Sequence, residues 1–143
     1  MTSARLIGSP CAMEIGLTSD VMEQMLAAAT AAHPQECCGL LLGSGVQITQ
    51  SQPARNVHQA PETHFEIDPQ TLVDAHRAAR DGGLQVLGYY HSHPTGALLP
   101  SPTDRAMAAG DGRIWAIVGR GSARFWRDKP DGFEALSYEV FEV

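Results

Sequence analysis

The segment from residue 91 to residue 104, HSHPTGALLPSPTD, carries the side chains of this chain that are best suited to chemistry. His91 and His93 lie two residues apart, Asp104 closes the segment, and Ser101 stands shortly before it. Imidazole nitrogens and a carboxylate oxygen are ligands of Zn²⁺, and three protein ligands leave the ion one open position. The pattern therefore predicts a catalytic metal site made by His91, His93 and Asp104.

The elements around this segment must aim the three ligands at one point. The stretch GLQVLGYY, residues 83–90, is typical of a strand. Residues two apart on a strand point the same way, so His91 and His93 can reach one ion. Three prolines stiffen the following loop, and Asp104 falls where the sequence SPTDRAMAA predicts the start of a helix.

Each of these residues also has a purely structural interpretation. A lone pair of histidines on a strand is more often a surface or core feature, and an aspartate at a helix start is explained by capping and the helix dipole. Glu36, in HPQECCGLLLG, could be an exposed residue at the start of a strand. It directly precedes a stretch that should be buried, however, where an unpaired carboxylate is costly.

The combination of these residues resembles the JAMM (MPN-plus) zinc metalloisopeptidase family, in its compact prokaryotic form. The family pattern is an upstream Glu followed by H-[ST]-H-P-x6-S-x2-D, and every element of it is present: Glu36, His91, Ser92, His93, Pro94, Ser101 and Asp104. The phrase PxECCGLLLG, Asn56 and residues 65–69 are also similar to prokaryotic members. The resemblance extends from about residue 12 to about residue 127.

The resemblance implies roles for the motif residues. His91, His93 and Asp104 would hold Zn²⁺, which would activate a water molecule near neutral pH. Glu36 would serve as general base and then general acid without being a ligand. Ser101 would donate a hydrogen bond to the oxyanion. Ser92 should face away from the metal, with a supporting hydrogen bond as its only role.

The resemblance also implies a substrate class. Members cut amide or isopeptide bonds after the C-terminal glycine of ubiquitin-like proteins, and small bacterial members act on sulfur-carrier proteins with a Gly-Gly tail. Two alternatives remain open: a metal-free MPN-type scaffold that only binds partners, and a peptidase for cell-wall or phage-tail peptides. Other zinc motifs fit less well, because the chain has no H-E-x-x-H string and its Cys37 and Cys38 are adjacent instead of forming C-x-x-C.

Composition is that of an ordinary globular protein. The chain has 143 residues, 43% hydrophobic and 18% charged, which predicts one domain spanning residues 1–143. A net charge of −6 without a cluster of basic residues argues against a nucleic-acid partner. The N-terminal stretch lacks the apolar region of a signal peptide, and no run approaches the roughly 18 apolar residues of a membrane span. Three cysteines favour a reducing, cytoplasmic location. The oligomeric state stays open.

The remaining pattern predicts a mixed, curved α/β sheet flanked by helices, and the resemblance implies the same α-β-α sandwich. The expected strands are 11–17, 36–43, 46–51, 84–92, 113–119, 122–127 and 132–142, with 65–67 pairing briefly, and the expected helices are 19–32, 69–81 and 102–110. Residues 52–64 are expected to form a loop or a short irregular strand. His33, His58, His64 and His76 are interpreted as structural, as are the adjacent cysteines Cys37 and Cys38. Trp115, Phe125 and Trp126 are expected to pack in the core or at an edge.

Overall fold

The computed structural model describes residues 14–142 of the chain. Within this part lie eight strands and three helices. In chain order they are β1 (Ile15–Thr18), α1 (Ser19–Ala32), β2 (Cys38–Ser44), β3 (Gln47–Ala54), α2 (Pro69–Arg80), β4 (Gln85–Ser92), α3 (Pro102–Met107), β5 (Ile114–Val118), β6 (Ala123–Lys129), β7 (Gly132–Leu136) and β8 (Tyr138–Phe141).

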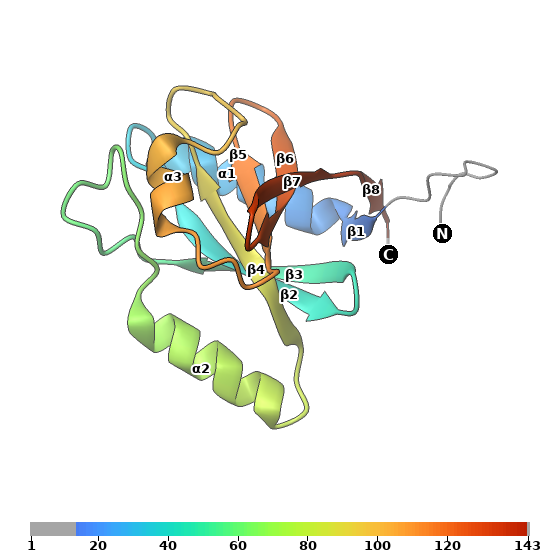
Figure 1. Ribbon diagram of the computed structural model, residues 1–143. Coiled ribbons are helices and arrows are strands. Elements are labelled where there is room, and N and C mark those ends of the chain that lie inside the picture. Colours follow the sequence, from blue (N-terminus) through green and yellow to red (C-terminus); the bar gives the residue numbers. More distant parts are fainter. Residues whose placement is uncertain (1–13, 143) are drawn as a thin grey trace.

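All eight strands belong to one mixed sheet, in the order β7-β6-β5-β4-β2-β3-β1-β8 (Figure 1). The pairs β4–β5, β1–β3 and β1–β8 are parallel, and the other pairs are antiparallel. Helices α1 and α2 lie on opposite faces of this sheet (Figure 1). The predicted fold class, a mixed sheet flanked by helices, is confirmed.

The sheet curls until its two outer strands approach each other. Its outer strands β7 and β8 are separated in sequence by Ser137 alone, so the two ends of the sheet must lie close together. Across this closure the Tyr138 hydroxyl donates to the Ala123 carbonyl over 3.2 Å, and the Tyr138 ring packs on Phe125 with 4.7 Å between ring centroids. Contacts between β8 and β6 therefore support the curvature, together with strand twist.

Successive side chains of the central strands point to opposite faces of the sheet, and each face packs in its own hydrophobic cluster. Leu41 of β2 packs in the cluster that includes Val21 and Met25 of α1. Its neighbours Leu40 and Leu42 point to the other face and share a cluster with Ala75 of α2. The near-continuous apolar sequence of β2 is thus explained by burial on both faces.

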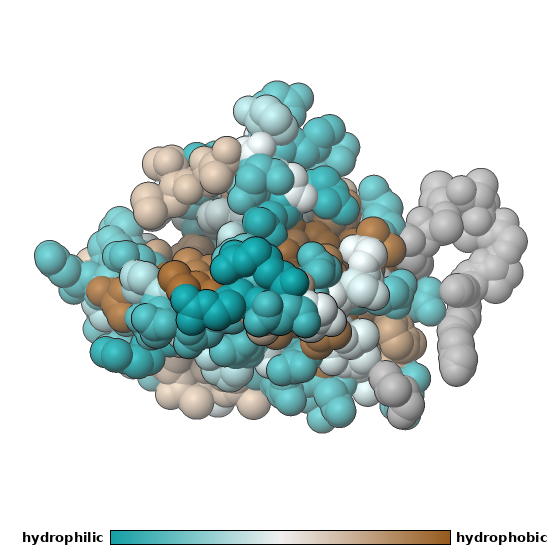
Figure 2. All heavy atoms as spheres, turned by 90° about the horizontal axis from the view of Figure 1, so that it is seen from below, coloured by the Kyte–Doolittle hydropathy of each residue, from teal (hydrophilic) through white to brown (hydrophobic). Residues whose placement is uncertain are grey.

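The two long helices begin and end where their sequence predicts. The Thr18 hydroxyl caps α1 by accepting from the Val21 amide, and Val21 and Met25 are its buried residues. The Asp68 side chain caps α2, whose first residue is Pro69. Hydrophilic residues cover much of the face nearest α2 (Figure 2). No helix within residues 14–142 has the length and apolar character needed to cross a bilayer.

The prediction of one strand over 132–142 is wrong. The segment forms two strands, with β7 pairing with β6 at one edge and β8 pairing with β1 at the other. The chain changes partner at Ser137, whose carbonyl accepts from the amides of Glu14 and Ile15 and whose amide donates to the Glu14 carboxylate. These bonds to the start of the chain join the last strand to β1.

Other boundaries also differ from the prediction. Strand β1 begins at Ile15, and residues 11–13 of the predicted strand lie outside the described residues. Residues 52–54, expected in a loop or a short irregular strand, extend β3 through its pairing with β2. Helix α3 ends at Met107 instead of residue 110, before Gly110 with its positive φ of 68°. Glu36 precedes β2 instead of opening it, because pairing with β4 starts at Cys38.

Candidate active site

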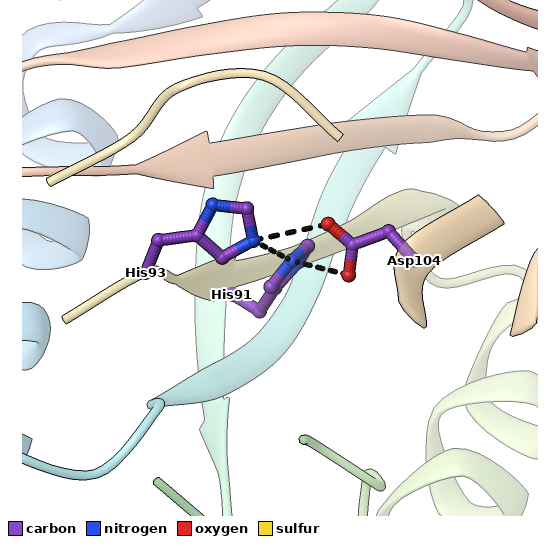
Figure 3. A group of neighbouring side chains, drawn as sticks. All are labelled: His91, His93 and Asp104. Carbon is purple, nitrogen blue, oxygen red and sulfur yellow. Dashed lines mark hydrogen bonds and ion pairs between the residues drawn. The ribbon is translucent and has the colours of Figure 1, made fainter. Parts of the chain in front are cut away.

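The end of β4 brings two histidines together. The Nε2 atoms of His91 and His93 lie 3.2 Å apart, as their spacing on one strand predicts (Figure 3). Both residues are buried, and His91 has no exposed surface. The adjacent strands β2 and β5 flank β4 at this point, through the pairs Cys38 with His91 and His91 with Ile117.

Helix α3 supplies the third member of the cluster. Asp104 Oδ1 lies 3.0 Å from His91 Nε2, and its Oδ2 lies 3.0 Å from His93 Nε2 (Figure 3). Asp104 also completes a capping box, in which the Ser101 amide donates to Asp104 Oδ2 over 2.9 Å and the Asp104 amide donates to Ser101 Oγ over 3.0 Å. The capping interpretation of Asp104 is thus correct and compatible with ligation, because the cap orients the carboxylate toward the histidines.

Contacts around the two imidazole rings fix their orientation. His93 Nδ1 donates to the Ala97 carbonyl over 3.0 Å, which leaves Nε2 directed at the cluster. The His91 ring stacks on Phe65 with 4.2 Å between centroids and meets the edge of Trp115 at 5.6 Å. His91 Nδ1 is buried without a hydrogen-bond partner among the described residues, so ring packing and the contact of Nε2 with Asp104 orient this side chain.

The three ligand atoms fit a tetrahedral cation. One ligand atom from each side chain lies within 4.8 Å of the others. The two histidine Nε2 atoms are 3.2 Å apart, and each lies 3.0 Å from a different carboxylate oxygen of Asp104. With bonds of about 2.0–2.1 Å, the ligands of a tetrahedral zinc lie about 3.3 Å apart. His91, His93 and Asp104 could therefore hold a metal ion with little rearrangement.

The ionisation states of Asp104 and His91 suit a cation, whereas at His93 burial is outweighed by the hydrogen bond with Asp104, which raises the pKa. Burial tends to raise the pKa of the Asp104 carboxyl, but hydrogen bonds with His91 and His93 outweigh it and hold that pKa well below its usual range. Burial lowers the pKa of His91 despite the nearby carboxylate. A carboxylate and a neutral imidazole are the forms of these side chains that bind metals.

Glu36 lies beside this cluster on the segment that leads into β2. Its side chain is buried, with 6% of the residue exposed. Burial raises the pKa of Glu36 to about 7, with His93 lowering it and Asp104 raising it further. A carboxyl group with a pKa near neutrality can take up and release a proton near physiological pH, as general acid–base catalysis requires.

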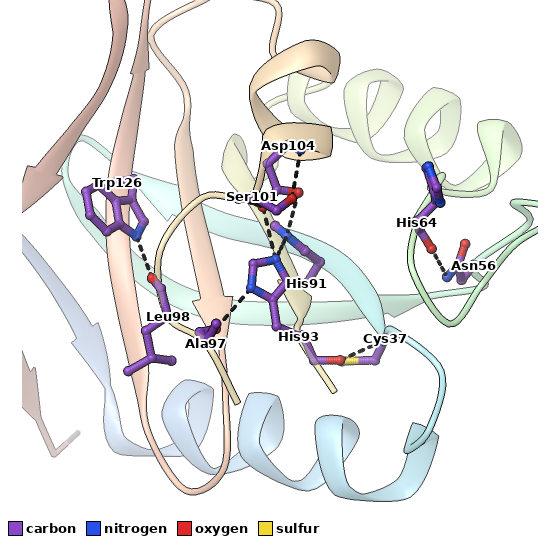
Figure 4. Close-up of polar contacts among 11 residues, drawn as sticks. Cys37, Asn56, His64, His91, His93, Ala97, Leu98, Ser101, Asp104 and Trp126 are labelled. Carbon is purple, nitrogen blue, oxygen red and sulfur yellow. Dashed lines mark hydrogen bonds and ion pairs between the residues drawn. The ribbon is translucent and has the colours of Figure 1, made fainter. Parts of the chain in front are cut away.

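Two side chains hold the Glu36 segment in place. Asn56 uses its full amide: Nδ2 donates to the carbonyls of His64 (Figure 4) and Glu36, each over 3.0 Å. Its Oδ1 accepts from the amides of His58 and Glu66. Asn56 is part of the resemblance to the prokaryotic members, but the resemblance implies no role for it.

Ser92 makes the second connection. Its hydroxyl accepts from the Cys37 amide over 2.8 Å, and its amide donates to the Cys37 carbonyl over 3.1 Å. Ser92 therefore ties the residue after Glu36 to the strand that carries the histidines. This is the supporting hydrogen bond that was expected of it.

The loop between β4 and α3 is anchored by its own carbonyls. The Ala97 carbonyl accepts from His93, and the neighbouring Leu98 carbonyl accepts from Trp126 Nε1 over 3.2 Å (Figure 4). Trp126 was expected only to pack in the core or at an edge, and it does so with 9% exposure. Its hydrogen bond to the loop between β4 and α3 could not be predicted from the sequence, because it joins residues that are 28 positions apart.

The remaining histidines and cysteines lie outside the cluster. His58 and His64 stack on each other, with 4.5 Å between ring centroids, and His91 and His93 are the histidines of the only metal-competent group within residues 14–142. Cys37 and Cys38 are free thiols, and Cys38 is buried as a small apolar residue would be. Cys11 lies outside the described residues.

The chain matches one protein family and is similar to several individual proteins. Residues 18–129 match the family model described as prokaryotic homologs of the JAB domain. The chain is 33% identical to a desampylase of Haloferax volcanii, over 98% of this chain and 99% of the relative. It is 27% identical to a CysO-cysteine peptidase of Mycobacterium tuberculosis, over 88% and 82%. The solution structure of protein DSY2949 from Desulfitobacterium hafniense is 32% identical, with a TM-score of 0.79 over 90% of this chain and 94% of that one.

Proposed function

Because this chain belongs to the family of prokaryotic JAB-domain homologs, which includes the JAMM-type metalloproteases, we propose that it is a zinc-dependent hydrolase. Its substrate would be an amide or isopeptide bond that follows the C-terminal glycine of a ubiquitin-like or sulfur-carrier protein. The desampylase and the CysO-cysteine peptidase are named for reactions on conjugates of this kind. The observation that carries the proposal is the convergence of His91, His93 and Asp104 within 4.8 Å beside the buried Glu36.

His91, His93 and Asp104 would hold the metal, which supplies Lewis-acid activation of water and of the scissile carbonyl. Glu36 accepts a proton from the attacking water as the water oxygen bonds to the carbonyl carbon. It returns this proton to the nitrogen as the carbon–nitrogen bond breaks, so the products are a glycine carboxylate and a free amine. The raised pKa of Glu36 suits both transfers.

Ser101 would stabilise the negative charge that develops on the carbonyl oxygen. Its oxygen already accepts from the Asp104 amide, and this bond leaves the hydroxyl hydrogen available as a donor. Donors of this kind contribute roughly 3–4 kcal/mol to the transition state in other hydrolases. One residue would thus cap α3 and act on substrate.

We further propose that residues 1–143 form one catalytic domain that acts in the cytoplasm. The single sheet, closed by a contact between β8 and β6, supports the first proposal. The free thiols of Cys37 and Cys38 fit a reducing compartment.

The direct test is cleavage of candidate ubiquitin-like and sulfur-carrier proteins that carry extensions after Gly-Gly, with products identified by mass spectrometry. The expected product is a carrier that ends in Gly-Gly, formed by the zinc-loaded protein and not after chelation. Stoichiometric zinc without cleavage of any carrier would contradict the substrate class. Absence of metal from the purified protein would instead favour a scaffold.

A further inference from the structure

A cavity of about 400 Å³ opens beside His93, on the side of the cluster that faces the end of α1. Its walls come from three segments: the α1 terminus with Thr30, His33 and Gln35, the end of the metal-bearing strand, and the turn between β5 and β6 with Arg120. His93 forms part of its wall. A group bound in this cavity therefore lies next to a proposed metal ligand.

The turn that carries Arg120 is fixed to the histidine strand. The His93 amide donates to the Val118 carbonyl over 2.9 Å. The Gly119 amide donates to the Ser122 carbonyl over 2.9 Å and so closes the turn. A Cβ at Gly119 would lie 2.7 Å from the Gly96 carbonyl, so only glycine permits this close approach. The loop after His93 and the Arg120 turn thus pack directly on each other.

Arg120 lies along this contact. A Cβ built at Gly96 would meet the Arg120 Cγ and Cδ atoms at 3.6 Å, which places the side-chain stem against the metal-side loop. Arg120 makes no ion pair within residues 14–142, whereas Arg113 and Lys129 pair with Asp111 and Glu134. Its guanidinium is therefore available to a ligand.

The charge around the cavity favours an anion. The chain has 16 acidic residues, yet none of them lines this cavity, while Arg120 does. The C-terminal end of α1 opposes an anion with its partial negative charge. Its Ala29 and Ala32 carbonyls already accept from the His33 and Gln35 amides, so the full charge of Arg120 outweighs this effect.

We propose that this cavity receives the leaving group and that Arg120 binds the α-carboxylate of a single amino acid attached after the terminal glycine. The inference rests on the proposed function. In such a substrate the carboxylate is separated from the scissile nitrogen by one carbon, so it must bind close to His93. In an isopeptide the nitrogen ends a lysine side chain, and no free carboxylate lies near it. Arg120 therefore selects a C-terminal amino acid over a lysine-linked protein.

The test uses one ubiquitin-like carrier ending in Gly-Gly-Ala, prepared as the free acid and as the carboxamide. Wild type is expected to show about a tenfold higher kcat/KM on the acid, as for a hydrogen bond to a charged group. Arg120→Gln is expected to abolish this preference, and Arg120→Lys to retain part of it. Arg124→Gln removes an exposed arginine from the neighbouring strand and serves as the matched control, with the preference intact.

A binding measurement separates this inference from the proposed function. The zinc-loaded Glu36→Gln protein is titrated with both forms of the fluorescently labelled carrier, and tighter binding of the acid is expected. If neither form is cleaved by wild type but the acid binds more tightly and Arg120→Gln removes the difference, the hydrolase assignment fails and the carboxylate site stands. Equal binding of acid and carboxamide, or a preference that survives Arg120→Gln, overturns the inference.

Discussion

Two pairs of histidines in this molecule contrast a candidate metal site with an ordinary pair of imidazoles. His58 and His64 stack in a half-buried loop, and their Nδ1 atoms bond to the Ala60 amide and the Thr63 hydroxyl nearby. The ring centroids of His91 and His93 lie 4.9 Å apart, against 4.5 Å in the other pair, but these two residues are fully or largely buried, and both Nε2 atoms point at Asp104. Two neighbouring histidines are therefore insufficient to form a candidate metal site. A carboxylate from another element and exclusion of water make the difference.

The largest expected effect is the loss of metal when His91 is substituted, in contrast to a substitution in the other histidine pair. His91→Ala removes one of three ligands and is expected to abolish both zinc binding and hydrolysis. His64→Ala, the matched control in the other pair, is expected to keep about one zinc per chain. Elemental analysis of both variants decides. Undiminished zinc in His91→Ala would remove His91 from the ligand set.

Glu36→Gln is expected to separate chemistry from metal binding. Glutamine preserves the shape of the side chain but cannot accept a proton, and loss of a general base costs about 10²–10⁴-fold in rate. The variant should keep its zinc and lose nearly all turnover, as measured by steady-state kinetics and elemental analysis together. Near-normal turnover refutes the role of Glu36, and loss of zinc would make it a ligand.

Ser101→Ala is expected to lower kcat by about 10²-fold with little change in KM, because its hydroxyl acts on charge that develops only in the transition state. It also removes a helix cap, so the protein should lose about 1 kcal/mol of stability. Thr18→Ala is the matched control, since Thr18 caps α1 away from the cluster. It should lose similar stability and keep full kcat. A Ser101→Ala protein with unchanged kcat at full zinc occupancy would leave only the structural role.

The smallest expected effect is on the pH profile. Burial raises the pKa of Glu36 to about 7 without metal, and a bound dication would lower it. A general base must be deprotonated, so kcat/KM should fall about tenfold per pH unit below an apparent pKa at or below 7. Rate measurements from pH 5 to pH 9 at constant zinc occupancy check this. If kcat/KM did not fall toward pH 5, Glu36 would either not titrate in this range or not act as the base.

The sequence predicted the cluster better than it predicted the sheet. The order of ligand types and their spacing identified His91, His93 and Asp104, because a strand and a helix cap are local structures. The position of β8 beside β1 could not be predicted, since it depends on the closure of the whole sheet. The same holds for Phe65, whose stacking on His91 joins segments far apart in the chain.

The most direct test of the central claim is the zinc K-edge X-ray absorption spectrum of the purified protein. We expect about one zinc per chain, with nitrogen and oxygen ligands alone at about 2.0–2.2 Å. Such a spectrum would match two histidines, one aspartate and an open position. A scatterer at about 2.3 Å would show a sulfur ligand, such as one of the free thiols of Cys37 and Cys38, and would contradict the assignment of the three ligands.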